Sequence, residues 1–129
     1  MKFISWSVNG LKSAINHGFV EDFKRQDADF FCLQRTRLDK GEEPIQIPNY
    51  YQYWNYAEKK GYSGTAIFTK YKPENVIYGM NNSIFDKDVN TDLKLSEITG
   101  LKMYFFTGLN AVLYVVPCNP SCDMIYQKF

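Results

Sequence analysis

The sequence predicts an α/β domain in which strands and a helical segment alternate near the N-terminus. Residues 2–8 alternate apolar and polar side chains, which is the pattern of a half-buried strand. Residues 11–26 repeat apolar side chains at helical spacing, and residues 30–34 form a short apolar run typical of a buried strand. Strand, helix and strand in this order favour a βαβ-like unit or an α/β sandwich.

The predicted helix has one apolar face and a weak middle. Apolar side chains recur every fourth residue, at Leu11, Ile15, Phe19 and Phe23. The pair His17-Gly18 interrupts this face, and glycine destabilises a helix interior. We therefore expect either two short helical turns or one kinked helix.

The remaining chain reads as strands joined by polar segments. We expect loops or turns at residues 39–49, 57–64 and 107–109, and a polar segment at 81–96. We expect strands at residues 50–56, 65–69, 75–78, 98–106 and 111–116.

Length and composition predict one domain, residues 1–129, with enough apolar side chains for a packed core. The formal net charge of +1 gives no global basic field, so any contact with DNA needs a local patch. No apolar run reaches the roughly 20 residues that span a bilayer, and no signal peptide is visible. These observations predict a cytoplasmic location and no membrane partner.

Three cysteines argue against a disulfide scaffold. Cys32 lies inside an apolar run and is interpreted as a small core residue. Cys118 and Cys122, with the distant His17, do not make a credible zinc site.

Four blocks of residues carry a resemblance to a known family. They are Trp-Ser-Val-Asn-Gly-Leu-Lys at 6–12, Leu-Gln-Arg-Thr-Arg at 33–37, Tyr-Gln-Tyr-Trp-Asn at 51–55 and Lys-Lys-Gly-Tyr-Ser-Gly-Thr-Ala at 59–66. In order and spacing they resemble the exonuclease III family of bacterial apurinic/apyrimidinic endonucleases, in the endonuclease/exonuclease/phosphatase superfamily. The resemblance covers residues 1–80 and leaves 81–129 as a divergent tail. It implies a partial four-layer α/β sandwich, with about one mixed β-sheet and flanking helices.

The resemblance implies a Mg²⁺-dependent phosphodiesterase site that is altered in this chain. Arg35 stands where the family has a metal-binding glutamate, and Ser7 stands where it has an active-site asparagine. Asn9 is identical to the second asparagine of the family motif and is taken as a catalytic position. A guanidinium cannot ligate a cation and stays charged at ordinary pH. Mg²⁺ is therefore implied by the family and is not expected to bind here.

The resemblance also implies contacts to the DNA phosphate backbone. The matching positions are Gly10, Lys12, Arg37, Lys59, Gly61, Tyr62 and Ser63. Glycine lets backbone N–H groups approach phosphate, and lysine and arginine add charge. Read without the resemblance, the same residues are two solvated turns with ordinary surface lysines.

The sequence therefore predicts a truncated, divergent exonuclease III-like DNA-repair nuclease with impaired catalysis, and leaves enzymatic activity open. The alternatives are a non-catalytic remnant that binds DNA or protein, or a gene fragment without a selected function. The aromatic inner face of the expected sheet needs a cover, with Tyr51, Tyr53, Phe68 and Phe105 as candidate members. We expect either that the tail folds over this face or that the chain self-associates through it.

Overall fold

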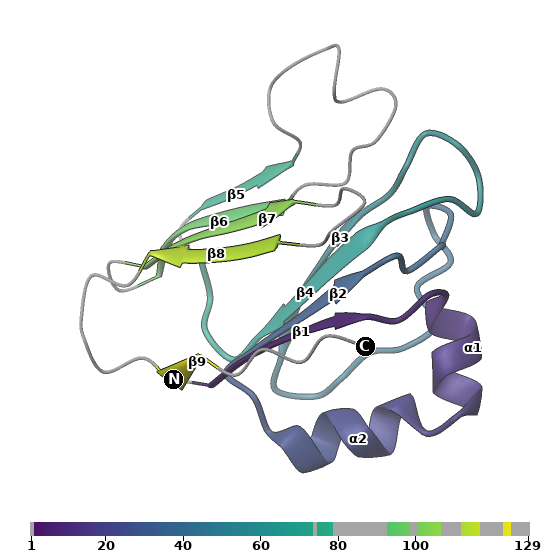
Figure 1. Ribbon diagram of the computed structural model, residues 1–129, viewed down its shortest axis with the longest axis horizontal. Helices are drawn as coiled ribbons and strands as arrows, with labels where there is room; N and C mark the ends of the chain where they lie inside the picture. The colour runs from purple at the N-terminus through teal and green to yellow at the C-terminus, as the bar shows by residue number, and fades with distance from the viewer. Residues whose placement is uncertain are drawn as a thin grey trace.

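The computed structural model describes residues 2–73, 75–78, 93–98, 101–106, 112–116 and 123–124 (Figure 1). The elements are β1 (Lys2–Ser7), α1 (Leu11–Asn16), α2 (Phe19–Gln26), β2 (Phe30–Gln34), β3 (Tyr51–Asn55), β4 (Thr65–Thr69), β5 (Asn75–Tyr78), β6 (Leu93–Ile98), β7 (Leu101–Phe106), β8 (Val112–Val116) and β9 (Asp123–Met124). The predicted α/β class is confirmed. Among the described residues, no helix has the length and apolar character needed to cross a bilayer.

The strands form two sheets. The first is mixed, in the order β3-β4-β2-β1-β9, with β1 parallel to both β2 and β9 and β4 antiparallel to β2 and β3. The second is antiparallel, in the order β5-β6-β7-β8. Figure 1 shows the second sheet on the side of the first sheet that is opposite α1 and α2. The molecule therefore has three layers, where the sequence indicated about one sheet with flanking helices.

The helical segment divides in two at Gly18, which confirms the first of the two predicted forms. Gly18 has φ 92°, a left-handed conformation that ends one helix and precedes the next. Each helix contributes to the same buried face, α1 through Leu11 and α2 through Phe19 and Phe23.

Two predictions about the tail were wrong. One strand was expected over residues 98–106, whereas β6 ends at Ile98 and β7 begins at Leu101 and pairs with it antiparallel. Residues 93–96 were placed in a polar segment, with the next strand beginning at residue 98, whereas β6 already starts at Leu93. Leu93 and Leu95 alternate with Lys94 and Ser96, a period of two that the polar composition of the segment hid. The expected turn at 107–109, and the cysteines Cys118 and Cys122, lie outside the described residues.

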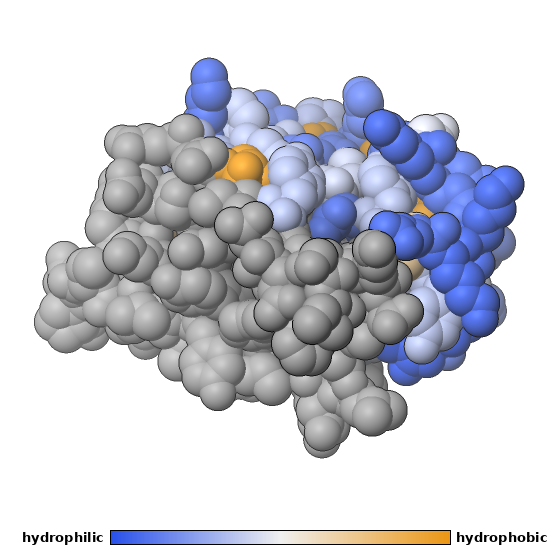
Figure 2. All heavy atoms as spheres, turned by 90° about the horizontal axis from the view of Figure 1, so that it is seen from above, coloured by the Kyte–Doolittle hydropathy of each residue, from blue (hydrophilic) through white to orange (hydrophobic). Residues whose placement is uncertain are grey.

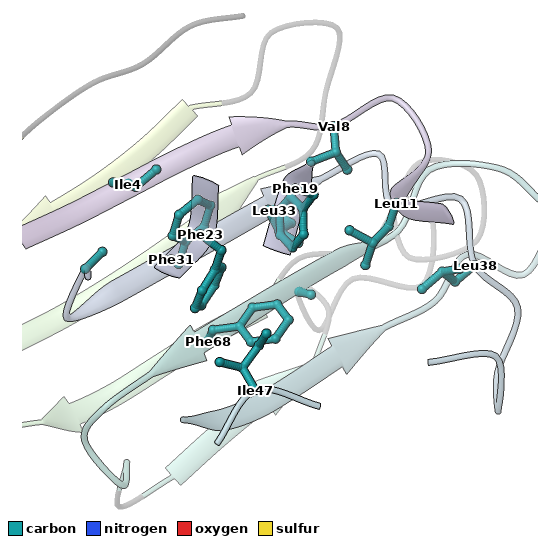
Figure 3. Close-up of a cluster of buried hydrophobic side chains, with 12 residues drawn as sticks. Ile4, Val8, Leu11, Phe19, Phe23, Phe31, Leu33, Leu38, Ile47 and Phe68 are labelled. Carbon is teal, nitrogen blue, oxygen red and sulfur yellow. The ribbon is translucent and has the colours of Figure 1, made fainter. Parts of the chain in front are cut away.

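The main core lies between the two helices and one face of the mixed sheet (Figure 3). Phe23 is at its centre, stacked on Phe31 with ring centroids 4.5 Å apart. The Phe23 ring also meets Phe68 and Tyr50 edge-on, at centroid distances of 5.2 and 5.0 Å. Offset and edge-on contacts of this kind add to the stabilisation from area burial alone.

The opposite face of the mixed sheet is also buried. Phe3, Cys32 and Ile67 lie on this face with no exposed surface, and burial raises the pKa of the Cys32 thiol well above its usual value. β6 lies next to β4, and the second sheet covers this face. Its strands β6, β7 and β8 belong to the tail, which was one of the two alternatives predicted. Phe68 was assigned to this face wrongly, because it packs on the helix side. The Phe105 side chain lies outside the described residues, and self-association stays a prediction.

Candidate functional site

The parallel strands β1 and β2 end together, which places their following residues at one edge of the mixed sheet. Ser7 pairs with Gln34 at the last register position. Beyond it the two segments stay connected, because the backbone N–H groups of Val8 and Gly10 donate to Gln34 O and Arg35 O at 3.1 and 2.8 Å. The family resemblance had assigned Ser7, Asn9 and Arg35 to one site, and these bonds bring the two segments together.

The loop after β3 joins the same edge. The backbone N–H groups of Thr36 and Arg37 donate to Gly64 O at 3.1 Å and to Ser63 O at 2.7 Å. We call residues 7–12, 35–37 and 59–64 the rim. Figure 2 shows mainly hydrophilic side chains at the right-hand end of the molecule, where β1 and β2 finish in Figure 1.

The rim backbone is strained. Asn9, Arg35, Arg37 and Ser63 have φ values of 50°, 56°, 54° and 45°, all in the left-handed region. For residues with a side chain this conformation costs roughly 1–2 kcal/mol each. The surrounding hydrogen bonds hold it in place, and strain of this kind concentrates at functional sites.

Arg35 is exposed and is fixed by one side-chain contact. Its Nη2 atom donates to Asn9 Oδ1 at 2.7 Å. Ser7, at the end of β1, is half-buried. The neighbouring Gln34 is buried and turns its amide into the sheet, where Nε2 donates to Ser5 Oγ at 2.9 Å.

These side chains do not fit a Mg²⁺ site. Mg²⁺ takes oxygen ligands and is bound in proteins chiefly by carboxylates. Ser7, Asn9 and Arg35 include no carboxylate, and the one amide oxygen, Asn9 Oδ1, already accepts from the Arg35 cation. In the described part of the chain, no group of three or more His, Cys, Asp or Glu side chains could hold a metal ion.

The residues predicted to contact DNA are brought together at the rim, and besides the backbone bonds already described, Lys12 and Gly61 contact acidic side chains of the 39–49 loop. Lys12 forms an ion pair with Glu42 at 3.1 Å, and the Gly61 N–H donates to Asp39 Oδ1 at 3.1 Å. The Asp39 N–H and the Lys12 ammonium together hold the pKa of Glu42 below its usual value.

Three further predicted residues, Arg37, Lys59 and Tyr62, are exposed to solvent. The Lys59 ammonium lies 5.3 Å from the centroid of the Tyr62 ring, within range of a cation–π contact. Tyr62 is 52% exposed, and Arg37 is exposed, as Arg35 is. These side chains are therefore available for an external ligand.

Sequence reasoning missed the residues that support the rim from inside. Thr36 is buried, and a Cβ atom added to Gly64 would lie only 2.4 Å from its Oγ1 atom, so only glycine fits there. Asp39 and Glu42 also went unassigned. Gly64 belongs to the Gly-Tyr-Ser-Gly block and could have been found from it, whereas the pairings of Asp39 and Glu42 depend on the tertiary fold.

A separate hollow of about 540 Å³ lies at the C-terminal end of α2. Its lining is Phe23, Lys24, Asp27, Ile47, Pro48, Asn49, Tyr50 and Lys70. Two of its charged groups, Lys70 and Asp27, pair with each other at 2.8 Å. We place the candidate site at the rim, where the strands end and the strained residues gather.

The chain matches the family model described as Endonuclease/Exonuclease/phosphatase family over residues 4–127. It is 47% identical over 89 residues to an exodeoxyribonuclease of Bacillus subtilis (strain 168), covering 68% of this chain and 35% of that protein. It is 36% identical over 90 residues to a DNA-(apurinic or apyrimidinic site) endonuclease of Dictyostelium discoideum, covering 68% of this chain and 25% of the relative. The chain thus spans about a third or less of the length of these relatives.

Solved structures show the same fold. The catalytic domain of Xenopus laevis APE2 matches with a TM-score of 0.53 and 31% identity, covering 62% of this chain and 27% of that domain. The 3' phosphatase NExo from Neisseria, bound to product DNA hairpin, matches with a TM-score of 0.61 and 23% identity, covering 77% of this chain and 38% of that structure. At that identity the second likeness concerns the fold alone.

Proposed function

Because the chain belongs to the endonuclease/exonuclease/phosphatase family, we propose that it is a nuclease homologue that binds the DNA phosphate backbone at the rim and has impaired Mg²⁺-dependent catalysis. Relatives are named as an exodeoxyribonuclease and as an apurinic or apyrimidinic site endonuclease. Duplex DNA is therefore the proposed partner.

The observation that carries the proposal is the position of the Arg35 guanidinium. Arg35 directly follows β2, and its guanidinium donates a hydrogen bond to Asn9, which follows β1. The family resemblance gives this position to a metal-binding carboxylate. Exchanging a negative for a positive charge reverses the field that a cation meets. At ~4 Å and an effective dielectric constant of ~20, each unit-charge pair is worth roughly 4 kcal/mol. Even after a large discount for solvent exposure, this opposes Mg²⁺ binding.

DNA binding is supported by the exposed positive side chains of the rim, including Arg35 itself. Arg35, Arg37 and Lys59 are exposed, and Tyr62 presents an aromatic ring beside Lys59. Contacts of this kind to phosphate position a duplex without reading its sequence. Because the net charge of the chain is only +1, the interaction depends on this local patch.

A second candidate is a divergent endonuclease with residual Mg²⁺-dependent activity. The 47% identity to an exodeoxyribonuclease over 89 residues favours it. Several statements stay predictions: that the chain is truncated, that it is cytoplasmic, and that it has no selected function. The division of the chain at residue 80 also stays a prediction.

Salt dependence of DNA binding tests the proposed function. In EDTA, affinity of the protein for a fluorescent duplex should fall steeply as salt rises, because each phosphate contact releases bound counterions. Lys59→Glu should weaken binding and reduce the slope of log affinity against log salt by about one. Lys24→Glu is the matched control, because Lys24 is an exposed lysine on α2 outside the rim. Salt-insensitive binding, or equal losses in both variants, would contradict the proposal.

Cleavage of an abasic-site duplex separates the two candidates. We expect no difference in nicking between Mg²⁺ and EDTA at high protein concentration. If nicking depended on Mg²⁺ and its rate changed in Arg35→Ala, the result would instead support the second candidate, a divergent endonuclease with residual activity.

A further inference from the structure

The hollow at the C-terminal end of α2 lies at the other end of the mixed sheet from the rim. Of its lining residues, Tyr50 directly precedes β3 and Lys70 directly follows β4. The last residue of β4 pairs with the first residues of β2 and β3, so these three strands share one edge there, whereas the rim lies where β1 and β2 finish (Figure 1). The hollow is therefore separate from the rim.

Much of the lining is apolar and continuous with the main core. Phe23 and Ile47 are buried members of the core cluster (Figure 3), and Tyr50 packs against that cluster. The rings of Phe23 and Tyr50 meet edge-on, with centroids 5.0 Å apart. Pro48 adds an exposed apolar ring. A ligand that covered this lining with an apolar or aromatic group would gain from removing apolar surface from water.

Hydrogen bonds hold both walls of the hollow in place. On one wall, the Tyr50 hydroxyl donates to Ala28 O at 2.6 Å, and the Tyr50 N–H donates to Ile47 O at 3.3 Å. On the other wall, Lys70 Nζ lies 2.8 Å from Asp27 Oδ1 and donates to Asp27 O at 3.1 Å. A site that is already formed has little ordering to lose when a ligand binds.

The charged side chains of the lining leave one positive charge over. They are two lysines and one aspartate, of which Lys70 and Asp27 pair with each other. The other lysine, Lys24, is exposed and takes part in none of the ion pairs of the described residues. Its ammonium stands on a flexible four-carbon chain and can meet a charged group of a ligand. A single negative charge therefore complements the hollow.

We infer that the hollow binds a small aromatic carboxylate, whose ring covers the apolar lining and whose carboxylate pairs with Lys24. The volume of about 540 Å³ falls within the range of small-molecule sites, roughly 300–1,000 Å³. An inorganic anion would leave the apolar lining uncovered, and a neutral aromatic compound would leave Lys24 without a counter-charge. This site is independent of the proposed function, because it shares no residue with the rim.

Titration of the full chain with 2-naphthoate, followed by amide chemical shifts, tests the inference. We expect saturable shifts at Asn49, Tyr50 and Lys70 and none at residues 59–64. The neutral 2-naphthalenemethanol should bind about two- to fivefold more weakly, as the loss of one exposed ion pair predicts. Acetate, which has the charge without the ring, should give no saturable shift.

Variants at Lys24 test the assignment of the carboxylate. Lys24→Gln should weaken 2-naphthoate by the same factor of about two to five and leave 2-naphthalenemethanol unchanged. Lys24→Arg keeps the charge and should bind both compounds as the wild type does. Arg25→Gln is the matched control, because Arg25 is the next residue of α2, lies outside the lining and pairs with Asp22. Unfolding curves should overlay for all three variants, because both positions are exposed.

Each other outcome overturns the inference. Without saturable shifts around the hollow there is no site. Equal affinity for the acid and the alcohol, or an unchanged affinity in Lys24→Gln, would remove the carboxylate from the assignment, and an equal loss in Arg25→Gln would reduce the effect to net charge. Duplex DNA should not displace 2-naphthoate, and displacement would mean that the hollow is part of a general surface for polyanions. Failure of the hollow to bind the probe would leave DNA binding at the rim untouched.

Discussion

The core beneath the helices and the rim beside it occupy neighbouring stretches of the same chain, yet they depend on opposite properties. Over residues 34–38 the side chains alternate, with Gln34, Thr36 and Leu38 buried and Arg35 and Arg37 exposed. Figure 3 shows Val8, Leu11 and Leu38 below the ends of β1 and β2, where they belong to the same apolar cluster as Phe23. The buried residues stabilise the fold, whereas the exposed arginines determine the charge at the edge of the sheet.

This difference gives a physical basis for the change of charge that we propose at Arg35. The Arg35 side chain contacts Asn9 and otherwise faces solvent, so exchanging a carboxylate for a guanidinium disturbs no packing. The core, in contrast, is made of interlocked rings in which each change is felt by several neighbours. We therefore expect substitutions of the exposed rim side chains to change stability little.

The largest effect that this comparison predicts is in the core. Phe23→Ala should lower the free energy of unfolding by about 3–5 kcal/mol, because it removes a buried ring that contacts Phe19, Phe31 and Phe68. Arg35→Ala should change it by no more than about 0.5 kcal/mol, as is usual for exposed positions. Urea denaturation measures both. A loss for Arg35→Ala as large as that for Phe23→Ala would show that core and rim are coupled.

An intermediate effect is expected where the rim meets the core. Gly64→Ala should destabilise the protein by about 2–4 kcal/mol, since the new Cβ would overlap Thr36 Oγ1 and the backbone has φ 95°. Gly41→Ala is the control, because Gly41 has φ 87° but no atom within 4 Å of the added Cβ. Its cost is the backbone strain alone, about 1 kcal/mol. Equal losses in the two variants would remove the steric part of this explanation.

Sequence patterns predicted the parts of this fold that are locally encoded. The apolar run of β2 and the four-residue spacing of Phe19 and Phe23 both specify burial directly, and both segments formed as expected. Phe68 was placed on the wrong face of the sheet because a continuously apolar strand such as β4 has no alternation to orient it. β6 was missed because its period of two lies within a polar stretch.

The candidate site was predictable in its membership but not in its internal contacts. Asn9 and Arg35 are 26 residues apart, and their meeting follows from the parallel pairing of β1 and β2 that the strand–helix–strand order indicated. The Lys12–Glu42 ion pair depends on how the 39–49 loop folds back, for which the sequence has no periodic signal. The same holds for the contact of Asp39 with Gly61.

The smallest predicted effect is the loss of one of two ion pairs. Lys12 and Glu42 pair at the rim, and Lys70 and Asp27 pair at the C-terminal end of α2. The backbone N–H of Asp39 and the ammonium of Lys12 lower the pKa of Glu42, and the hydrogen bond from Lys70 lowers the pKa of Asp27. A lowered folded-state pKa means that each carboxyl stabilises the protein above its unfolded pKa, near pH 4. This stabilisation is lost as the pH falls through the folded-state value. Glu42→Gln and Asp27→Asn should each lower the thermal midpoint slightly at pH 7, and each should match the wild type once the pH is below the folded-state pKa of the carboxyl that it replaces.

DNA binding then separates the two variants. Glu42→Gln frees Lys12 at the rim, so it should strengthen duplex binding at low salt, an effect that fades at high salt. Asp27→Asn frees Lys70 at the end of α2, where the hollow lies, and should leave duplex affinity almost unchanged. Parallel measurements of the thermal midpoint and of duplex affinity test this contrast. An equal gain in affinity for both variants would mean that DNA responds to overall charge, and the rim would then have no special part in holding it.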